Sequence, residues 1–354
     1  MKSQKLYVIR ISDKFRKIYD KSIHLEHDLF EVKEYYKSYD EYIEPSLLYF
    51  TQDPRKIAKA LEVKRVIPMG QYIRGLLGGE AGRGRPYAGL VLVEYSYGDS
   101  EFEFRLYGTT TKLSVPKVWL PRYGVDVYEL IYVGMINPFR LKRLLPVLLS
   151  NRGSRSLREF LRVSLGANTS KMPSSDVEKI STLINELKQP ESLDIMNRDF
   201  YYVVYRCDRA FTACLIKPSS RTVLDSHVSA IECEDESKAY YYVGVLNYLA
   251  YKVVAKGRTF PRHQFARPAL AIVIAGLSWR DIDANVGDRV IELVRKLEQK
   301  VPTREFPNQR IALNYIANYA EFKKLIEVLD ENVEKERLEQ ALSLVSGTSN
   351  KKRK

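Results

Sequence analysis

The chain has little cysteine and histidine for its length, and this limits the chemistry that it can be expected to carry. Three cysteines and four histidines are spread over 354 residues, and no Cys-x-x-Cys pair occurs. Such spacing argues against a disulfide framework and supplies no set of zinc ligands. No apolar run has the length of a membrane-crossing helix, and Arg10 and Asp13 interrupt the short apolar run at the start. We therefore expect a cytoplasmic protein with no metal, no cofactor and no membrane partner.

Positive charge is what the sequence has in excess. Lysine and arginine total 57 against 44 acidic residues, which gives a net charge of +13 and a pI near 9.4. This surplus attracts polyanions and speeds encounter with them, without choosing among them. No basic amphipathic helix stands out as a membrane anchor, so nucleic acid is the expected partner. The 25 tyrosines and the many charged residues resemble the composition of thermophilic proteins.

The pattern of elements predicts a mixed α/β chain. Its clearest element is a β-hairpin around a Gly-Asp turn, with strands at 90–97 and 100–106. Other strands are expected at 5–11, 115–120 and 128–133, and helices at 55–61, 141–149, 157–165 and 176–187. The expected regions are an N-terminal mixed α/β region (1–150), a helical linker region (151–189), a second α/β domain (190–285), a helical cap or docking arm with an amphipathic helix at 287–299 and two further helices (286–345), and a basic disordered tail (346–354).

Residues 201–283 are the most informative stretch. Apolar runs at 201–205 and 211–216 flank a polar turn, and 228–231 adds a third short strand. A helix with an acidic entrance follows, with Ser237 as a plausible cap and apolar residues at helical spacing. The chain then enters a basic loop, 256–267, which ends on an apolar run, 270–274. A rigid platform that carries a loop rich in hydrogen-bond donors suits the reading of a nucleic acid.

This order of elements resembles the target-recognition domain of adenine-specific DNA methyltransferases of the TaqI type, and of related restriction–modification subunits. In that family the helix has the form acidic residue, x, x, Ala-Tyr-Tyr-Leu, x, x, Leu-Leu-Asn-Ser, and a basic aromatic loop and a short apolar strand follow it. The matching residues here are Glu236-Ser237-Lys238-Ala239-Tyr240-Tyr241-Tyr242-Val243-Gly244-Val245-Leu246-Asn247, with Tyr248 where serine is usual. The resemblance covers about a quarter of the chain. It implies recognition of a DNA sequence in partnership with a methylating or cleaving module.

The chain departs from the complete methyltransferases of that family. They carry a glycine-rich turn for S-adenosylmethionine and an Asn-Pro-Pro-[Tyr/Phe] or Asp-Pro-Pro-[Tyr/Phe] loop that holds a flipped adenine. Here Asn137-Pro138-Phe139 lacks the second proline, and no such glycine-rich turn lies upstream. We interpret these three residues as an ordinary turn into a helix that begins near Leu141. The sequence therefore favours a protein that is not a methyltransferase by itself.

Two loops and one short motif supply the candidate contacts to DNA. Arginine and glutamine can bond guanine and adenine edges in the major groove, whereas lysines and backbone amides hold phosphates. If the family topology holds, the basic loop and the polar loop near 217–221 lie together on the DNA side. Arg83-Gly84-Arg85-Pro86 resembles the core of an AT-hook, which enters a narrow minor groove, although a plain surface loop is the alternative. The candidate DNA-binding residues are Lys256, Arg258, Arg262, His263, Gln264, Arg267, Lys217, Arg221, Arg83 and Arg85.

Two other functions stay open. Glu94, Asp99, Glu103 and Lys112 could surround a metal as in PD-(D/E)xK nucleases, but Glu-x-Lys is absent and the alternation along the hairpin is typical of a solvated strand face. An RNA-binding protein that stacks bases on tyrosines would prefer single strands. His227 reads as an ordinary loop histidine. The leading hypothesis is a sequence-specific protein for double-stranded DNA that acts with a separate methyltransferase or restriction subunit and has no complete catalytic motif of its own.

Overall fold

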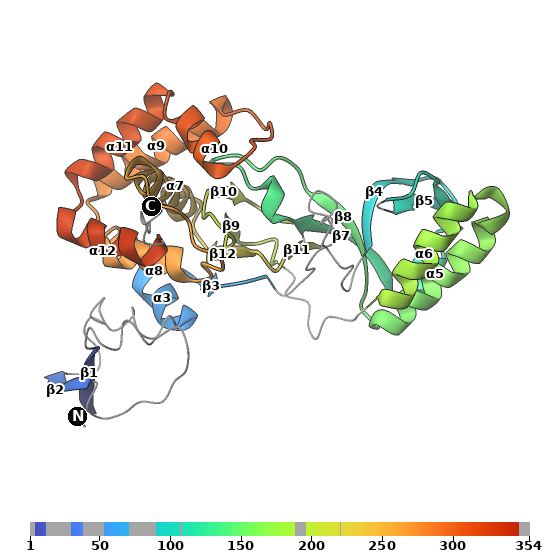
Figure 1. Ribbon diagram of the computed structural model, residues 1–354, viewed down its shortest axis with the longest axis horizontal. Helices are drawn as coiled ribbons and strands as arrows, with labels where there is room; N and C mark the ends of the chain where they lie inside the picture. The colour runs from blue at the N-terminus through green and yellow to red at the C-terminus, as the bar shows by residue number, and fades with distance from the viewer. Residues whose placement is uncertain are drawn as a thin grey trace, which may run out of the picture. The chain divides into compact units, whose positions relative to one another are not determined.

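The computed structural model describes residues 4–11, 30–37, 53–70, 90–106, 108–187, 196–219 and 221–346 (Figure 1). Contacts divide the chain into two compact units, Met1–Thr51 and Gln52–Lys354. In the first unit, β1 (Gln4–Ile11) pairs antiparallel with β2 (Phe30–Lys37). This confirms the strand expected at 5–11.

A four-stranded antiparallel sheet forms the first half of the second unit. Its strand order is β10-β9-β12-β3. Tyr201 lies opposite Cys233, and Arg206 lies opposite Val228, so these two pairs mark the two ends of the sheet. The strands are β3 (Arg65–Ile67), β9 (Tyr201–Arg206), β10 (Ala213–Ile216) and β12 (Val228–Cys233), and helix α3 (Pro54–Leu61) leads into β3.

The long helix α7 (Glu236–Ala255) covers one face of this sheet (Figure 1). Its cap is Asp235, whose side chain accepts a hydrogen bond from the backbone N–H of Lys238, rather than Ser237 as expected. Most of its side chains are buried around its whole circumference, because the sheet lies on one side and further helices lie on the other. At Gly244, a Cβ atom would come within 2.8 Å of Val294, so the absent side chain permits this close helix packing.

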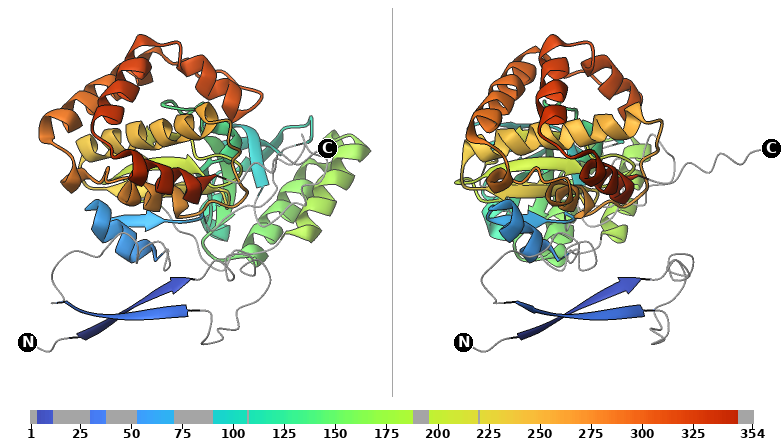
Figure 2. Two further views of the ribbon diagram at one scale, coloured as in Figure 1. Left: turned by 60° about the vertical axis from the view of Figure 1, so that its left-hand side comes forward. Right: turned by 90° about the vertical axis from the view of Figure 1, so that its left-hand side faces the viewer.

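The C-terminal helices pack against α7 and against one another (Figure 2). The short apolar strand that the resemblance implies after the basic loop is wrong, because residues 270–274 form part of helix α8, which has Pro268 in its first turn. The expectation of two helices after the one at 287–299 is also wrong, because three helices follow it. The first of the two expected helices is interrupted at residues 317–319 and forms α10 and α11. The helices are α8 (Arg267–Ile274), α9 (Ala284–Lys300), α10 (Gln309–Ile316), α11 (Ala320–Glu331) and α12 (Lys335–Val345).

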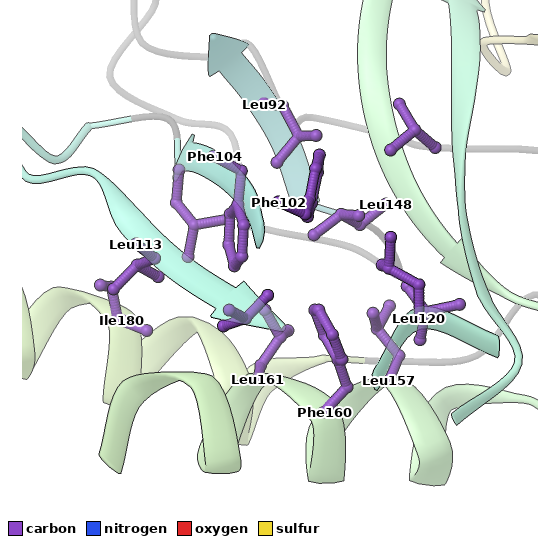
Figure 3. Close-up of a cluster of buried hydrophobic side chains, with 14 of the residues drawn as sticks. Leu92, Phe102, Phe104, Leu113, Leu120, Leu148, Leu157, Phe160, Leu161 and Ile180 are labelled. Atoms are coloured by element: carbon purple, nitrogen blue, oxygen red, sulfur yellow. The ribbon is translucent and has the colours of Figure 1, made fainter. Parts of the chain in front are cut away.

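A six-stranded sheet of order β11-β7-β8-β4-β5-β6 forms the other half of the unit. Phe102 and Phe104 point from β5 toward Phe160 and Leu161 of α5 and Ile180 of α6, and form a buried cluster (Figure 3). The hairpin of β4 and β5 is as expected, and so are the two helices α5 and α6, which were expected at 157–165 and 176–187. The strands are β4 (Leu90–Tyr97), β5 (Glu101–Leu106), β6 (Leu113–Pro116), β7 (Val125–Ile131), β8 (Leu145–Ser150) and β11 (Thr222–Leu224), and the helices are α4 (Trp119–Tyr123), α5 (Ser154–Asn168) and α6 (Ser174–Glu186).

Two predictions in this half are wrong. The expected helix at 141–149 is strand β8, which pairs with β7 on one side and β4 on the other. The expected strand at 115–120 ends at Pro116 and gives way to the short helix α4. Three short 3-10 helices complete the described elements, η3 (Val133–Met135), η4 (Thr169–Lys171) and η5 (Trp279–Asp281).

The two sheets are joined by strands that cross the expected region boundaries. β11 pairs parallel with β7, and the chain then continues directly into β12 of the other sheet. A shared core joins Ile131 and Ile136 to Tyr202 and Val204. The mixed α/β class with a C-terminal helical segment is confirmed. In the described part of the chain, no helix combines the length and apolar character needed to cross a membrane.

Candidate nucleic-acid interface

Three loops meet at the end of the four-stranded sheet marked by Arg206 and Val228. The backbone N–H of Cys207 donates to the carbonyl of His227 at 2.9 Å, and the N–H of Gln264 donates to the carbonyl of Cys207 at 2.5 Å. These bonds join the turn after β9 (207–212), the loop before β12 (225–227) and the basic loop between α7 and α8 (256–266). We call these three segments together the loop-end surface.

Gly70 brings the end of β3 against the same loops. Its N–H donates to the carbonyl of Val228 at 2.7 Å. A Cβ atom at Gly70 would lie 2.2 Å from the backbone oxygen of Asp225, a separation that no side chain tolerates. The absence of a side chain therefore permits this backbone approach.

The basic loop is held by buried anchors. Gln264 is 0 % exposed and donates from Nε2 to the carbonyl of Val345 at 3.0 Å. The carbonyl of Phe265 accepts a hydrogen bond from the hydroxyl of Tyr205 at 3.2 Å. His263 and Phe265 have φ angles of 55° and 49°, a left-handed conformation that costs a non-glycine residue about 1–2 kcal/mol. The hydrogen bonds of Gln264 and Phe265 offset this strain and hold the loop in one conformation.

These anchors overturn the role expected of Gln264. Because its amide is buried and bonded to Val345 at the end of α12, it cannot meet a base edge in this conformation. Arg262 and His263 are exposed, and Arg267 is half-buried at the start of α8. Arg209, in the turn after β9, is also exposed and has a φ of 55°. Sequence reasoning did not select Arg209, although its place in a polar turn was visible.

One lysine and one arginine of the loop, Lys256 and Arg258, are turned toward α12 instead. Arg258 donates to Glu339 at 2.7 Å, and the ammonium of Lys256 contacts the same carboxylate. Burial and the neighbouring Arg258 and Lys252 lower the pKa of Lys256. Part of the positive charge at the start of the loop is therefore neutralised within the protein.

The second polar loop lies at the opposite end of the sheet. Lys217 follows the last residue of β10 and sits 5.0 Å from the centre of the Tyr201 ring, at the end marked by Tyr201 and Cys233. Arg221 pairs with Asp126 of the other sheet at 3.3 Å. The expectation that both loops share one side is therefore wrong. Arg83 and Arg85 lie outside the described residues, as does the basic tail beyond Ser346.

Asn137, Pro138 and Phe139 have a packing role. Asn137 is buried and donates to the carbonyl of Arg304 at 3.0 Å. Phe139 is 1 % exposed, packs against Phe322, and donates from its backbone N–H to Ala213. The expected turn is present, but no helix follows it at Leu141. The buried Asn137 has no route to a flipped base in this arrangement.

The hairpin carboxylates behave as a solvated strand face. Glu94 pairs with Arg105 at 3.8 Å and with Lys112 at 3.9 Å, and Glu103 accepts from Ser96 at 3.4 Å. Among the described residues, no group of three or more histidine, cysteine or acidic side chains is placed to hold a metal ion. The three cysteines are buried, and burial raises the pKa of Cys207 to about 12, which keeps its thiol protonated near neutral pH.

The matching helix of the recognition-domain resemblance is present, and its asparagine has a defined task. Asn247 is fully buried in α7, accepts from the N–H of Ala213 at 3.0 Å, and donates to the carbonyl of Ala213 at 2.8 Å. It thereby satisfies one residue of the edge strand β10, as a neighbouring strand would. Tyr248, where serine is usual, donates to Asp330 at 2.7 Å.

Comparisons with known protein families, with curated proteins and with solved structures find no match to this chain.

Proposed function

We propose that the chain binds double-stranded DNA through the loop-end surface and reads its sequence as the recognition subunit of a separate methyltransferase or restriction subunit. The observation that carries the first part is the placement of Arg262 and His263. Both are exposed on a loop whose neighbouring residues, Gln264 and Phe265, are bonded into the core. A side chain on a fixed backbone loses little freedom on binding, so its contacts add to affinity and specificity.

The charges of the surface fit a polyanion. Arg262 and Arg209 are exposed at adjacent loops, and the chain as a whole carries a net charge of +13. Arginine bonds guanine with two parallel hydrogen bonds and also holds phosphates. The proposal of a separate partner subunit has two supports. Residues 236–247 resemble those of recognition domains, and the buried Asn137 has a packing role, so that catalysis would have to come from another chain.

Selection of bound duplexes from a randomised DNA pool, at physiological salt, tests this function directly. We expect an enriched motif of several base pairs. Arg262→Ala should weaken binding by about 1–3 kcal/mol and relax one position of the motif if the guanidinium reads a base. Equal weakening for every sequence would make Arg262 a phosphate contact. The matched control is Arg162→Ala, an exposed arginine on α5, which packs against the six-stranded sheet instead.

The absence of any enriched motif, with binding that fades as salt rises, would contradict sequence reading and leave only a general attraction to polyanions. Copurification of the chain with a methyltransferase or nuclease encoded beside it is the corresponding test of the partner.

A second candidate is binding of single-stranded nucleic acid on the six-stranded sheet. Tyr95 and Tyr97 are 42 % and 49 % exposed, and the ammonium of Lys117 lies 5.3 Å from the centre of the Tyr97 ring. Exposed tyrosines beside a cation can stack bases while the cation attracts the backbone. Preference for single strands that is lost in Tyr97→Ala would favour this candidate over the first.

A further inference from the structure

Three aromatic rings are stacked on the loop-end surface. The ring centres of His227 and His263 are 6.0 Å apart with 28° between their planes, and those of His263 and Phe265 are 5.7 Å apart with 13° between theirs. His263 is exposed, whereas His227 and Phe265 are half-buried. The strained φ angles of His263 and Phe265 place these two rings on the same side of the loop, next to His227. Two histidines that lie far apart in the sequence are thus brought together.

A buried carboxylate lies behind the first histidine. Asp225 is 1 % exposed, and its Oδ2 lies 3.8 Å from Nδ1 of His227. Oδ1 accepts a hydrogen bond from the hydroxyl of Ser226 at 3.4 Å. Oδ2 has no hydrogen-bond partner of ordinary length within the described part of the chain. A buried carboxylate of this kind is stabilised by a positive charge beside it, and a protonated His227 supplies that charge.

The remaining groups around the stack are mostly cationic or neutral. Arg262 precedes His263 and is exposed, and Arg209 is exposed on the adjoining turn beside the half-buried Asp208. The thiol of Cys207 lies 3.8 Å from the carbonyl of Ser226 and stays protonated. Burial raises the pKa of Asp225, and the nearby His227 opposes that rise. A protonated His227 therefore favours the ionised form of Asp225, whereas His263 and its chain neighbour Arg262 are exposed to solvent.

We propose that His227 and His263 form a phosphate-binding site that takes up a proton when a phosphate or phosphodiester binds. The charge of a protonated His227 is balanced by Asp225. A second proton on His263 would place another cation beside His227 and Arg262, which is unfavourable without a counter-charge. A phosphate anion supplies this counter-charge, so anion binding and protonation strengthen each other by the same factor. The phosphodiester source rests on the proposed function, whereas the site itself does not.

Proton NMR of the imidazole C–H groups in the full chain tests the site. Four histidines give few signals, and His227→Gln and His263→Gln assign two of them. We expect inorganic phosphate, or a short DNA duplex, to shift both assigned signals and to raise the pH midpoint of His263. Signals that respond to neither probe would overturn the site. Because His263 is exposed, His263→Gln should leave the fold intact.

Duplex affinity as a function of pH tests the linkage. The wild type should bind about tenfold more tightly near pH 6 than near pH 8, and His263→Gln should remove most of this difference. Arg162→Ala on α5 is the control, because this exposed arginine lies outside the loop-end surface and its loss should leave both the affinity and its pH dependence unchanged. A pH dependence that survives unchanged in His263→Gln would overturn the linkage.

The two probes separate this inference from the proposed function. Shifts with inorganic phosphate but no duplex binding would support the site and contradict the DNA function, leaving a free phosphate or small phosphorylated molecule as the ligand. Tight duplex binding with a flat pH profile and unmoved imidazole signals would support the function and overturn the site.

Discussion

Glu339 of α12 accepts a hydrogen bond from Arg258 of the basic loop at 2.7 Å. The same carboxylate contacts the ammonium of Lys256. One acidic side chain therefore holds two of the loop's cations, and the charge available to a polyanion depends on α12.

Replacing Glu339 by glutamine should release these two cations toward the solvent. We expect tighter binding to duplex DNA and a steeper fall of affinity with salt, by about one to two units of the logarithmic slope, because more phosphates can be neutralised. Filter binding or fluorescence anisotropy over a range of salt concentrations measures both quantities. Glu336→Gln on the exposed side of the same helix removes an equal charge and serves as the control. Identical slopes for the two variants would show that Glu339 does not limit the loop.

Gln264→Leu should change stability rather than sequence preference. The substitution keeps much of the volume but removes the donor to the buried carbonyl of Val345, at a cost of about 1–3 kcal/mol. Chemical denaturation measures the loss, and duplex selection below the new melting temperature checks the motif. Unchanged stability together with an altered motif would restore Gln264 as a base-reading residue.

Two of the wrong element predictions share one physical cause, which is the position of a proline. The run at 141–149 reads as an apolar helix, but Pro146 would lie in its interior, where it removes a hydrogen bond and clashes with the preceding turn. In the structure Pro146 lies in strand β8. The run at 270–274 reads equally well as a strand, but Pro268 precedes it at the position that favours the start of a helix. Apolar runs alone could not separate the two states, whereas the prolines could.

The sequence predicted where the basic loop lies, but not which of its side chains are buried or which other loop it contacts. The basic loop was found from its composition, yet composition gives no burial, and so Gln264 and Arg262 looked alike. The placement of Lys217 follows from the antiparallel pairing of the two strands. Because β9 ends at the turn that contains Cys207, β10 runs back and ends at the opposite end of the sheet. The contact between His227 and His263 could not be foreseen, because it depends on how two loops 36 residues apart are held on Cys207.

Asn247→Asp should destabilise the protein strongly. The amide of Asn247 both donates to and accepts from Ala213 in a fully buried place. A carboxylate keeps the acceptor but loses the donor and brings a charge into the core, which is among the costliest of single changes. We expect a loss of about 3 kcal/mol or more at neutral pH, partly recovered in acid as the carboxyl is protonated. Urea unfolding at two pH values measures this, and equal stability of variant and wild type would contradict the bridging role.

Asp176 makes the stability of the other half of the unit depend on pH. Its Oδ2 accepts hydrogen bonds from the hydroxyls and backbone N–H groups of Thr110 and Thr111, at 2.8 to 3.1 Å. The hydroxyl of Thr111 contributes most to lowering the pKa of Asp176 below its ordinary value of 3.8. The ionised form is therefore favoured by folding, and its contribution is fully present above that ordinary value.

As the pH falls below the ordinary value and through the lowered pKa, the contribution of Asp176 should disappear. Asp176→Asn should accordingly lower the melting temperature by several degrees near pH 7, and the gap from the wild type should narrow near pH 2.5. Calorimetry at both pH values measures the two gaps. Glu178→Gln on the same helix, whose carboxylate belongs to a solvent-facing stretch, is the matched control and should show little change at either pH. A gap for Asp176→Asn that stays constant between the two pH values would show that its hydrogen bonds do not depend on its charge.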